Sequence, residues 1–506
     1  MMTARIQEFA VSLSFLVDGL VDNPPVPDLG ITGVSTDSRR IQAGDLFIAY
    51  ETASYSNIPY IADAVNAGAS TVLVDEELLP GNFICSVPVI FIPELYKYVG
   101  IICARFYGQP SDQVNVIGVT GTNGKTSVSH IIARALSECS GKHAGLIGTL
   151  GTGLYEGLQP GWNTTPDAQN VQKLFFEMQM RGARHIVLEV SSHGIDQFRI
   201  SGTRFKLAVF TNLSRDHLDY HGTMENYALS KQRLFTDYEV EHAVINLDDI
   251  FGIKMSRNIR EVIPVTGYTL EEETYQSSAI SENCVYGKIV SQSIQGMILQ
   301  IHSPWGEGEL HSSLFGEYNA SNFLAACAAL VLLGFDFPDV ITALSGTCMI
   351  PGRMEVFGKE NTCKVVIDYA HTPAALEKVL KTLRPLCNAR LICVFGCGGD
   401  RDRGKRPEMA KIVEFIADAV IITNDNPRNE DPGLIIEEVL SGFASNDNVS
   451  VIPDREQAIR EAFNSAGRED VVLLAGKGHE DYQEIAGKRI PFSDSNIVTR
   501  LLGEIS

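Results

Sequence analysis

The stretch GVTGTNGKTS, residues 118–127, holds three glycines and a lysine followed by two hydroxyl residues, directly after the apolar run VNVIGV. A strand, a glycine-rich turn and a helix form a phosphate site, because backbone N–H groups and the helix N-terminus face the anion. In such a loop Lys125 reaches the β- and γ-phosphates of a nucleotide, and the Thr126 hydroxyl binds Mg²⁺. The usual first glycine of GxxxxGK[ST] is replaced by Val119. We therefore predict a polyphosphate site of unusual pattern.

Further residues that suit metal or phosphate chemistry follow other apolar runs. LEVSSHGIDQFR places Glu189 at the end of a predicted buried strand, where a carboxylate beside a phosphate loop suits a metal ligand. TNLSRDHLDYHG places His217 in a loop, and the helical pattern MENYALSKQRLF carries Lys231. Taken alone, a loop histidine is more often a hydrogen-bonded surface residue and a helical lysine a solvated one.

The bulk composition describes a globular protein of several domains. The chain has 506 residues, too many for one core, so we expect two to four domains. Its formal net charge of -21 argues against a nucleic-acid surface. The longest apolar run, at 323–335, is shorter than the ~20 residues that a membrane span needs. The ten cysteines form no CxxC pair, so we expect reduced thiols in a cytoplasmic protein with no membrane segment. The N-terminal FAVSLSFLV is a poor signal peptide, and we expect a core helix there.

The order of apolar runs predicts an α/β fold with three domains. Continuously apolar runs between 110 and 250 alternate with helical patterns, which indicates a parallel sheet covered by helices. A similar alternation restarts after PGRMEVF, and the more polar segment 265–315 suggests strands at one sheet edge. We predict a mixed α/β domain at 1–110, a parallel-sheet phosphate-loop domain at 111–350 and a Rossmann-like domain at 351–506.

Nine motifs in fixed order carry a resemblance to a known family. They are TGTNGKT, EVSSHG, SRDHLDYHG, GEYNASN, PGRME, DYAHTP, GCGGDRDRGKRP, TNDNPR and GKGHE. Together they resemble the Mur ligases of peptidoglycan synthesis over nearly the whole chain. The resemblance implies ATP-driven amide bond formation, in which the D-Glu side-chain carboxylate of UDP-N-acetylmuramoyl-L-Ala-D-Glu is phosphorylated and then attacked by the amine of a diamino acid. We expect a monomer.

The resemblance also assigns roles to residues of the nucleotide site. The residues that it implies for catalysis are Lys125, Glu189, His217 and Lys231, with Lys231 carbamylated by CO₂. Thr126, Glu189, His217 and the Lys231 carbamate would bind Mg²⁺, since a carbamate offers the oxygen ligands of a hard cation. His371 lies in the same nucleotide-facing turn as Asp368. The residues implied for ATP are Gly121, Thr122, Asn123, Gly124, Lys125, Thr126, Ser127, Asn322, Arg353 and Asp368.

Two further sets are implied for the other substrates. The nucleotide-sugar dipeptide would contact Ser38, Thr164, Thr165, Ser191, Gln197 and Arg199. The loop ETASYSNIPYI, residues 51–61, departs from the family pattern G-x-x-x-D-G-H-x-F-I, so residues 53–55 carry no assignment. The amino acid would contact Arg401, Asp425, Asn426, Pro427, Arg428, Gly476 and Glu480.

The tetrapeptide DNPR, residues 425–428, favours one amino acid. It resembles the form in enzymes that add meso-diaminopimelate, whose distal carboxylate an arginine can bind in bidentate fashion. Glu480 suits the distal ammonium. Two alternatives stay open: a lysine-adding ligase of the same family, and a catalytically inactive regulatory homologue.

Overall fold

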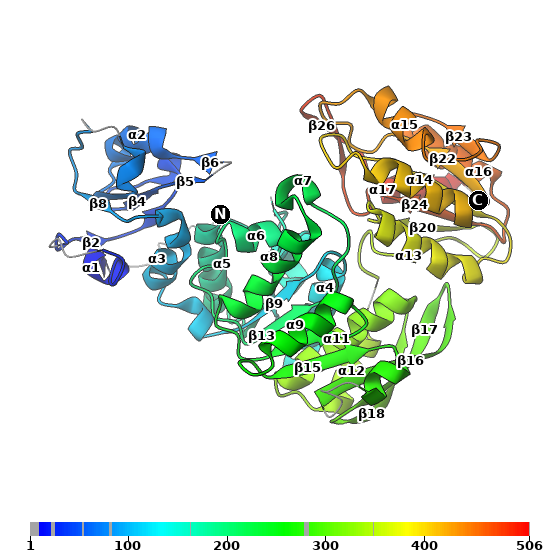
Figure 1. Cartoon of the computed structure of the whole chain (residues 1–506), viewed down its shortest axis with the longest axis horizontal. Helices are drawn as coiled ribbons and strands as arrows, with labels where there is room; N and C mark the ends of the chain where they lie inside the picture. Colours follow the sequence, from blue (N-terminus) through cyan, green and yellow to red (C-terminus); the bar gives the residue numbers. More distant parts are fainter. Residues whose placement is uncertain are drawn as a thin grey trace.

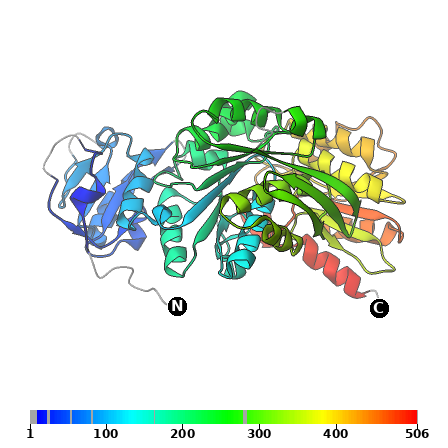
Figure 2. The ribbon, with the colours of Figure 1, turned by 90° about the horizontal axis from the view of Figure 1, so that it is seen from below.

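The computed structural model shows three lobes in chain order. The middle lobe, cyan to green in Figure 1, lies between the blue N-terminal lobe and the yellow-to-red C-terminal lobe, and the rotated view in Figure 2 shows the same order. The structure describes residues 10–21, 26–52, 55–79, 83–161, 163–277, 283–347 and 349–504. Within these ranges, no helix has both the length and the apolar character that crossing a membrane requires.

The N-terminal lobe is built on a four-stranded parallel sheet with strand order β3-β4-β7-β8. Every residue of β4 and β7 is buried, as their apolar sequences predict. The expected N-terminal helix is a single turn, α1, because Val11 and Ser12 pair as a strand with Ile31 and Gly30 instead; Phe9 lies outside the described residues. The elements are β1 (Val11–Ser12), α1 (Leu13–Leu16), β2 (Gly30–Ile31), β3 (Val34–Ser35), β4 (Leu46–Ala49), β5 (Glu51–Thr52), β6 (Tyr55–Ser56), α2 (Ile61–Ala67), β7 (Thr71–Val74), β8 (Val89–Phe91) and α3 (Val99–Phe106).

The middle lobe contains a ten-stranded sheet with order β11-β10-β12-β9-β13-β14-β15-β16-β17-β18. Its central pairs are parallel, whereas the pairs β10–β11, β16–β17 and β17–β18 at the two edges are antiparallel. The strands are β9 (Asn115–Thr120), β10 (Gly145–Gly148), β11 (Gly151–Leu154), β12 (His185–Glu189), β13 (Leu207–Phe210), β14 (Ala243–Asn246), β15 (Val265–Thr269), β16 (Cys284–Ser293), β17 (Gly296–Ser303) and β18 (Gly306–Ser312).

Helices cover both faces of this sheet, so alternate residues of each central strand enter two different cores. Ile117 and Val119 of β9 pack with α4, α11 and α12, whereas Val116 packs with α5, α8 and α9. Two-sided burial explains why these strands are continuously apolar in sequence. The helices are α4 (Lys125–Ser140), α5 (Ala168–Met180), α6 (Ser192–Asp196), α7 (Leu218–His221), α8 (Met224–Thr236), α9 (Ile250–Ile259), α10 (Glu272–Ser277), α11 (Glu317–Leu332) and α12 (Phe337–Ser345).

The C-terminal lobe has a six-stranded sheet with order β19-β20-β24-β21-β22-β23, parallel except for β19. Helices α13, α14 and α15 pack on one face, and α16 and α17 on the other. The elements are β19 (Glu355–Phe357), β20 (Lys364–Asp368), α13 (Pro373–Leu383), β21 (Leu391–Phe395), α14 (Lys405–Ile416), β22 (Ala419–Ile422), α15 (Pro432–Leu440), β23 (Val449–Val451), α16 (Arg455–Ser465), β24 (Val471–Ala475), β25 (Tyr482–Ile485), β26 (Lys488–Pro491) and α17 (Asp494–Glu504).

The element order agrees with the architecture expected from sequence. The two predicted parallel sheets are present, and the 265–315 segment forms edge strands of the middle sheet. The hairpin β25–β26 was not predicted. The domain boundaries 1–110, 111–350 and 351–506 remain our proposal. The segments that connect α3 to β9 and α12 to β19, which contain each proposed boundary, support it.

A buried ion pair ties two elements of the C-terminal lobe together. Arg455 at the start of α16 contacts Asp494 at the start of α17 through Nε–Oδ1 and Nη2–Oδ2 distances of 2.9 and 2.7 Å. Both side chains are 0% exposed, and Arg455 Nη2 also donates to the Ala475 carbonyl oxygen at 3.1 Å. The pair therefore supports the end of β24, where predicted amino-acid-binding residues begin.

We predict that Asp494→Ala lowers the free energy of unfolding by about 3–5 kcal/mol, because it leaves a buried guanidinium without its counter-charge. Thermal and urea unfolding followed by circular dichroism would measure this. Arg460→Ala, which removes a half-exposed pair with Glu456, is the control and should cost less than about 1 kcal/mol. Equal effects of the two variants would contradict the role given to the buried pair.

Candidate active site

The predicted phosphate loop joins β9 to the first turn of α4. Gly121 adopts a positive φ of 149°, and a Cβ atom there would lie 1.9 Å from the Thr211 hydroxyl, so the turn requires glycine. The Lys125 side chain folds back over the loop, where its Nζ donates to the carbonyl oxygens of Gly121 (2.7 Å) and Thr122 (2.8 Å). Burial lowers the pKa of Lys125. Two neutral carbonyl groups therefore hold a buried amine at the place predicted for phosphate.

The segment after β13 fixes the rest of the loop. Thr122 N donates to the Asn212 carbonyl oxygen at 2.8 Å, and Asn123 N donates to Asn212 Oδ1 at 3.0 Å. The Thr211 hydroxyl donates to the Asn123 carbonyl oxygen at 2.6 Å. A Cβ atom at Gly124 would lie 2.9 Å from Asn322 Oδ1, which places this predicted ATP residue of α11 beside the loop.

Glu189 ends β12 directly beneath the start of α4. Its side chain is 0% exposed, and its Oε2 accepts from the hydroxyls of Thr126 and Thr149, each at 3.0 Å. Oε1 accepts from Thr149 N at 3.0 Å. Burial raises the pKa of Glu189, and the bond from Thr149 N and the charge of Lys125 oppose the rise. The predicted carboxylate and hydroxyl ligands thus lie together.

This donor set fits Mg²⁺ bound through phosphate. Glu189 and Thr126 offer hard oxygen atoms within 3.0 Å of each other, the ligand type that Mg²⁺ prefers. Among the described residues, no group of three or more His, Cys, Asp or Glu side chains is arranged to hold a metal ion. Mg²⁺ usually takes one or two carboxylates and completes its shell with water and substrate phosphates, so a site of this kind depends on the nucleotide.

Lys231 reaches the same loop from α8. The side chain is 1% exposed, its Nζ donates to the Gly121 carbonyl oxygen at 2.9 Å, and it lies 4.4 Å from the centre of the Tyr227 ring. Burial, reinforced by the charge of Lys125, lowers the pKa of Lys231 well below its ordinary value. This shift favours the unprotonated amine, the form that can act as a nucleophile toward CO₂.

His217 is the N-cap residue that precedes α7, and its backbone is left-handed, with φ 53°. Its Nε2 lies 3.4 Å from Asp216 Oδ2. Loss of solvation lowers the pKa of His217 to about 4; Asp216 opposes this, whereas Lys125 and Lys231 add to it. The ring is therefore neutral and able to offer a lone pair to a cation.

The C-terminal lobe contributes Arg353 to the loop. Arg353 Nη2 donates to the Thr126 hydroxyl at 3.2 Å, and its guanidinium lies 4.7 Å from the centre of the Tyr369 ring. Asp368 at the end of β20 accepts from Met354 N at 2.8 Å. Burial raises the pKa of Asp368 to about 6, which the charge of Arg353 opposes. The predicted nucleotide residues of the middle and C-terminal lobes thus face one another.

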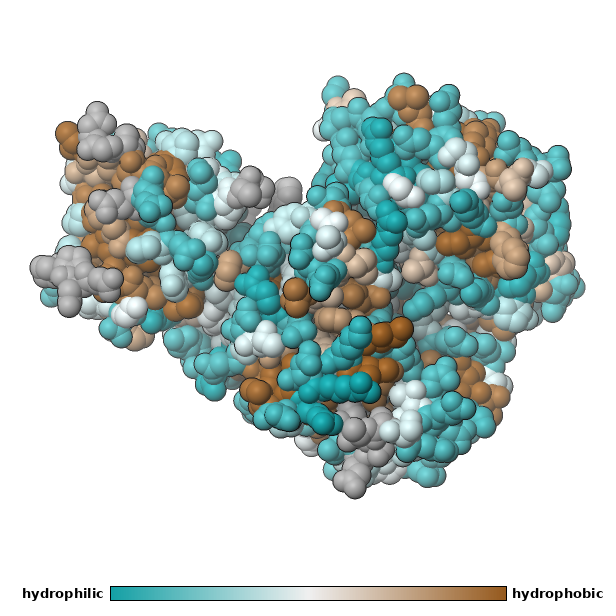
Figure 3. Space-filling model, in the orientation of Figure 1, coloured by the Kyte–Doolittle hydropathy of each residue, from teal (hydrophilic) through white to brown (hydrophobic). Residues whose placement is uncertain are grey.

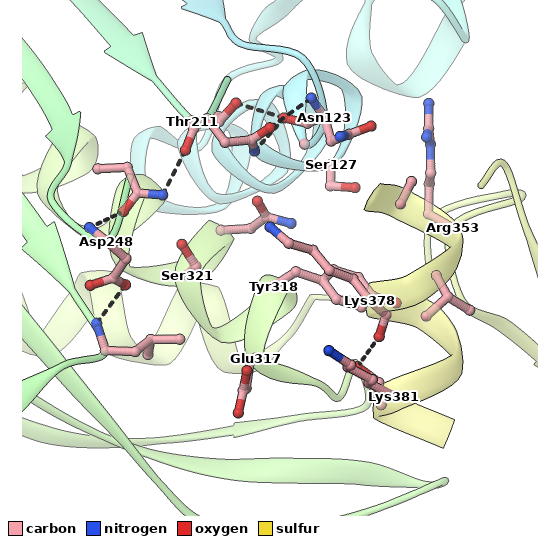
Figure 4. Close-up of a pocket in the computed structure, with 18 of the residues that line it drawn as sticks. Asn123, Ser127, Thr211, Asp248, Glu317, Tyr318, Ser321, Arg353, Lys378 and Lys381 are labelled. Carbon is pink, nitrogen blue, oxygen red and sulfur yellow. Dashed lines mark hydrogen bonds between the residues drawn. The ribbon is translucent and has the colours of Figure 1, made fainter. Parts of the chain in front are cut away.

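A cavity of about 620 Å³ lies between these lobes next to the phosphate loop. Figure 4 shows Asn123 and Ser127 at one side, Arg353 at another, and Glu317, Tyr318 and Ser321 from α11. This volume is typical of small-molecule sites. Sequence reasoning had indicated Asn123, Ser127, Asn322, Arg353 and Asp368. It missed Tyr318, a variable position of the GEYNASN motif, and Asp248, Lys288, Lys378 and Lys381, which lie in no motif named above.

Most residues predicted for the nucleotide-sugar dipeptide cluster around Glu189. The Thr165 hydroxyl donates to the Glu189 carbonyl oxygen at 2.8 Å and to Ser191 Oγ at 3.0 Å. Arg199 Nη1 donates to the Thr165 carbonyl oxygen at 2.9 Å, and its Nη2 donates to Gln197 Oε1 at 2.6 Å. The Thr164 and Thr149 hydroxyls lie 3.0 Å apart.

Ser38 lies apart from this cluster, in the turn Ser38–Arg40 of the N-terminal lobe. The neighbouring Thr36 connects the two lobes, because its N and Oγ1 each donate to Gln169 Oε1 of α5 at 2.9 Å. Ser38 thus lies two residues from the contact between the N-terminal and middle lobes.

The residues predicted for the amino acid follow the carboxyl ends of β21, β22 and β24, which are neighbouring strands. Ligands of open parallel sheets bind at this edge. Asn426 Nδ2 donates to Glu480 Oε2 at 2.7 Å. Lys477, which the sequence did not single out, is 0% exposed and donates to Asn426 Oδ1 at 3.1 Å and to Glu480 Oε2 at 3.0 Å. A Cβ atom at Gly476 would lie 2.6 Å from Asp425 Oδ2.

Two further residues predicted for the amino acid are Arg401, in the loop after β21, and Pro427, in the loop after β22; these two loops contact each other. Arg401 is exposed, with Nη1 donating to the Asp400 carbonyl oxygen at 2.9 Å. The Pro427 carbonyl oxygen lies 1.9 Å from where a Cβ atom at Gly399 would be, so only glycine allows this approach.

An ion-paired arginine joins the middle lobe to this region. Arg215, two residues before His217, lies 3.3 Å from Asp402 through Nε and 3.0 Å from Glu408 through Nη1. The loop that carries His217 is thereby held against the segment that carries Arg401.

A phosphate loop on one parallel sheet, facing a second nucleotide-type fold across a shared cavity, defines an ATP-dependent ligase. Family models agree: the Mur ligase middle domain matches residues 119–330, and the Mur ligase glutamate ligase domain matches 352–478. The chain belongs to the Mur ligase family.

Close relatives share almost the full length. The UDP-N-acetylmuramoyl-L-alanyl-D-glutamate–2,6-diaminopimelate ligase of Pseudomonas aeruginosa is 46% identical over 94% of this chain and 96% of its own. The protein of the same name from Coxiella burnetii is 44% identical over 92% and 94%. A solved structure of an enzyme with this name superposes with a TM-score of 0.70 at 36% identity, covering 98% of this chain and 99% of that one.

We predict that Lys125→Ala abolishes ATP-dependent phosphate release while leaving the fold intact, because it removes the amine aimed at the phosphates. The measurement is phosphate release at saturating substrates, with circular dichroism to check folding. Lys142→Ala, an exposed lysine just beyond the end of α4, is the control and should retain full activity. Normal turnover by the Lys125 variant would remove the phosphate-loop assignment.

Proposed function

We propose that the chain joins meso-diaminopimelate to the D-Glu side-chain carboxylate of UDP-N-acetylmuramoyl-L-Ala-D-Glu, using ATP. The observation that carries this proposal is the ion-paired contact of Arg215 with Asp402 and Glu408. It sets the amino-acid loops of the C-terminal lobe against the middle-lobe loop that borders the phosphate site. We also propose that the enzyme is cytoplasmic and acts as a monomer. One chain carries both the residues predicted for the nucleotide-sugar dipeptide and those predicted for the amino acid.

The reaction has to activate a poor electrophile. A carboxylate oxygen of D-Glu attacks the γ-phosphorus of ATP, ADP leaves, and an acyl phosphate results. The diaminopimelate amine then attacks the acyl carbon, phosphate departs with the C–O bond electrons, and the nitrogen loses a proton. Positioning and neutralisation of charge dominate the catalysis of such phosphoryl transfers.

The residues of this chain supply positioning and positive charge. Lys125 lies over the loop and would exchange its two carbonyl acceptors for phosphate oxygens. Arg199 and the hydroxyls near Glu189 would bind the acidic dipeptide. Mg²⁺ would neutralise charge on the phosphates, with Thr126, Glu189, His217 and the carbamate of Lys231 as its protein ligands. The burial of Lys231 and the lowered pKa of its amine support the carbamate.

The Arg428 loop favours diaminopimelate over lysine, because lysine lacks a distal carboxylate and would bring its ammonium toward a guanidinium. The presence of Lys125, Glu189, His217 and Lys231 in one site argues against an inactive regulatory homologue.

We expect phosphate release with the nucleotide-sugar dipeptide and meso-diaminopimelate to exceed release with lysine by at least about tenfold, and Arg428→Ala to raise KM for diaminopimelate by a similar factor. KM for ATP should stay within about twofold, since the proposal assigns Arg428 to the amino acid and not to the phosphates of ATP. The exposed Arg468 of the same lobe, changed to Ala, is the control. Equal loss toward both substrates would show that Arg428 is structural.

Lys231→Ala should lose most activity and regain part of it in short carboxylates such as acetate or formate, which would replace the carbamate oxygens. Lys125→Ala serves as the comparison, because its missing group is a cation that no carboxylate replaces. Absence of recovery at any carboxylate concentration would count against carbamylation.

A further inference from the structure

The hairpin β25–β26 lies along the loop that carries Arg428. Arg428 N donates to the Glu484 carbonyl oxygen at 2.9 Å, and Ala486 N donates to the Arg428 carbonyl oxygen at 2.7 Å. Glu484 N donates to Asn426 Oδ1 at 2.9 Å, and Gln483 Nε2 donates to the Asp425 carbonyl oxygen at 3.1 Å. Three hairpin residues, Gln483, Glu484 and Ala486, thus bind Asp425, Asn426 and Arg428 of the DNPR loop.

These bonds hold Arg428 in an unusual backbone conformation. Its φ of 52° falls in the left-handed region, which is sparsely populated by residues other than glycine. Such conformations persist when surrounding contacts fix them, and they cluster at functional sites. The paired backbone bonds to Glu484 and Ala486 provide that fixation.

The side chain of Arg428 is held on two of its edges. Nε lies 3.2 Å from Glu484 Oε2, and Nη1 donates to the Gly399 carbonyl oxygen at 2.7 Å. A Cβ atom at Gly398 would lie 2.9 Å from Nη1, so the guanidinium packs closely on this glycine. Within the described ranges, Nη2 donates no hydrogen bond to the protein, and the ion pair with Glu484 is closest through Nε. A guanidinium has five N–H donors, so this edge keeps donors for a ligand.

The two acidic residues near this loop have different surroundings. Glu480 Oε2 already accepts from Asn426 and from the buried Lys477, which compensates its charge. Glu484 instead pairs with Arg428, and the two side chains are 27% and 19% exposed. In the described part of the chain, Glu484 is the acidic side chain within ion-pair distance of Arg428.

We infer that Glu484 is a positioning residue for the incoming amino acid: it fixes the Arg428 guanidinium through Nε so that Nη2 is presented to the distal carboxylate. An arginine side chain loses rotamer freedom when it is held by a ligand, and holding it in the binding orientation beforehand removes that cost from substrate binding. This inference rests on the proposed function, since it assigns the carboxylate of diaminopimelate to Arg428.

The test is the steady-state kinetics of Glu484→Ala and Glu484→Gln in the full-length chain. We expect Glu484→Ala to raise KM for meso-diaminopimelate about tenfold, because the guanidinium would no longer be held in its binding orientation beforehand, with KM for ATP and kcat within about twofold. Glu484→Gln keeps an acceptor oxygen and the side-chain length, and should recover most of the loss. Lys488→Ala, an exposed change on the other strand of the hairpin, should match the unaltered protein.

A double variant separates a role through Arg428 from any other role. In the Arg428→Ala background, Glu484→Ala should add no further rise in KM for diaminopimelate. An unchanged or lower KM in the single Glu484→Ala variant, an equal rise in KM for ATP, or a further rise in the double variant would each overturn the inference. Lack of diaminopimelate-dependent phosphate release by the unaltered chain would instead overturn the proposed function.

Discussion

The carbonyl oxygen of Gly121 accepts hydrogen bonds from two lysine side chains, the partly buried Lys125 at 2.7 Å and the buried Lys231 at 2.9 Å. Bringing two amines together away from water is unfavourable when both are charged, and burial accordingly lowers the pKa of each. The Lys125 amine favours a ligand that carries several negative charges, whereas the carbamate that we propose on Lys231 would be an anion and would bind Mg²⁺. The polyphosphate chemistry that we propose for the middle lobe therefore depends on Lys125.

The other parts of the structure are arranged around that point. Glu189 and His217 arrive from the carboxyl ends of strands or the loops beyond them, in the same sheet as the phosphate loop. Arg353 enters from the C-terminal lobe and contacts Thr126, the residue next to Lys125. The amino-acid loops occupy the corresponding edge of the second sheet. Two parallel sheets thus present their ligand-binding edges to one region, which is what a reaction joining several substrates requires.

The sequence predicted the parts whose signals are local. Strands such as β9 and β12 are continuously apolar because helices cover both faces of their sheet. The turn before Lys125 requires the glycines that the sequence shows there, since Gly121 and Gly124 adopt positive φ. The hairpin β25–β26 escaped prediction because its exposed strands carry mixed charged and apolar residues without a core-facing pattern.

Contacts between distant segments were not predictable either. The pairing of Arg455 with Asp494, the buried Lys477 and the lining residues Tyr318 and Lys378 depend on how helices and lobes pack. The roles of the individual site residues stay predictions, because sequence and geometry place the groups without their ligands.

The contact of Arg215 with Asp402 and Glu408 has a further consequence for motion. Arg215 and Glu408 are 43% and 42% exposed, and attraction between exposed charges falls as ionic strength rises, with a screening length of about 8 Å at 0.15 M. The attraction between these two side chains, which join the middle lobe to the C-terminal lobe, therefore weakens as the salt concentration rises. Dissolved ions thus change the strength of this contact between the lobes independently of any substrate.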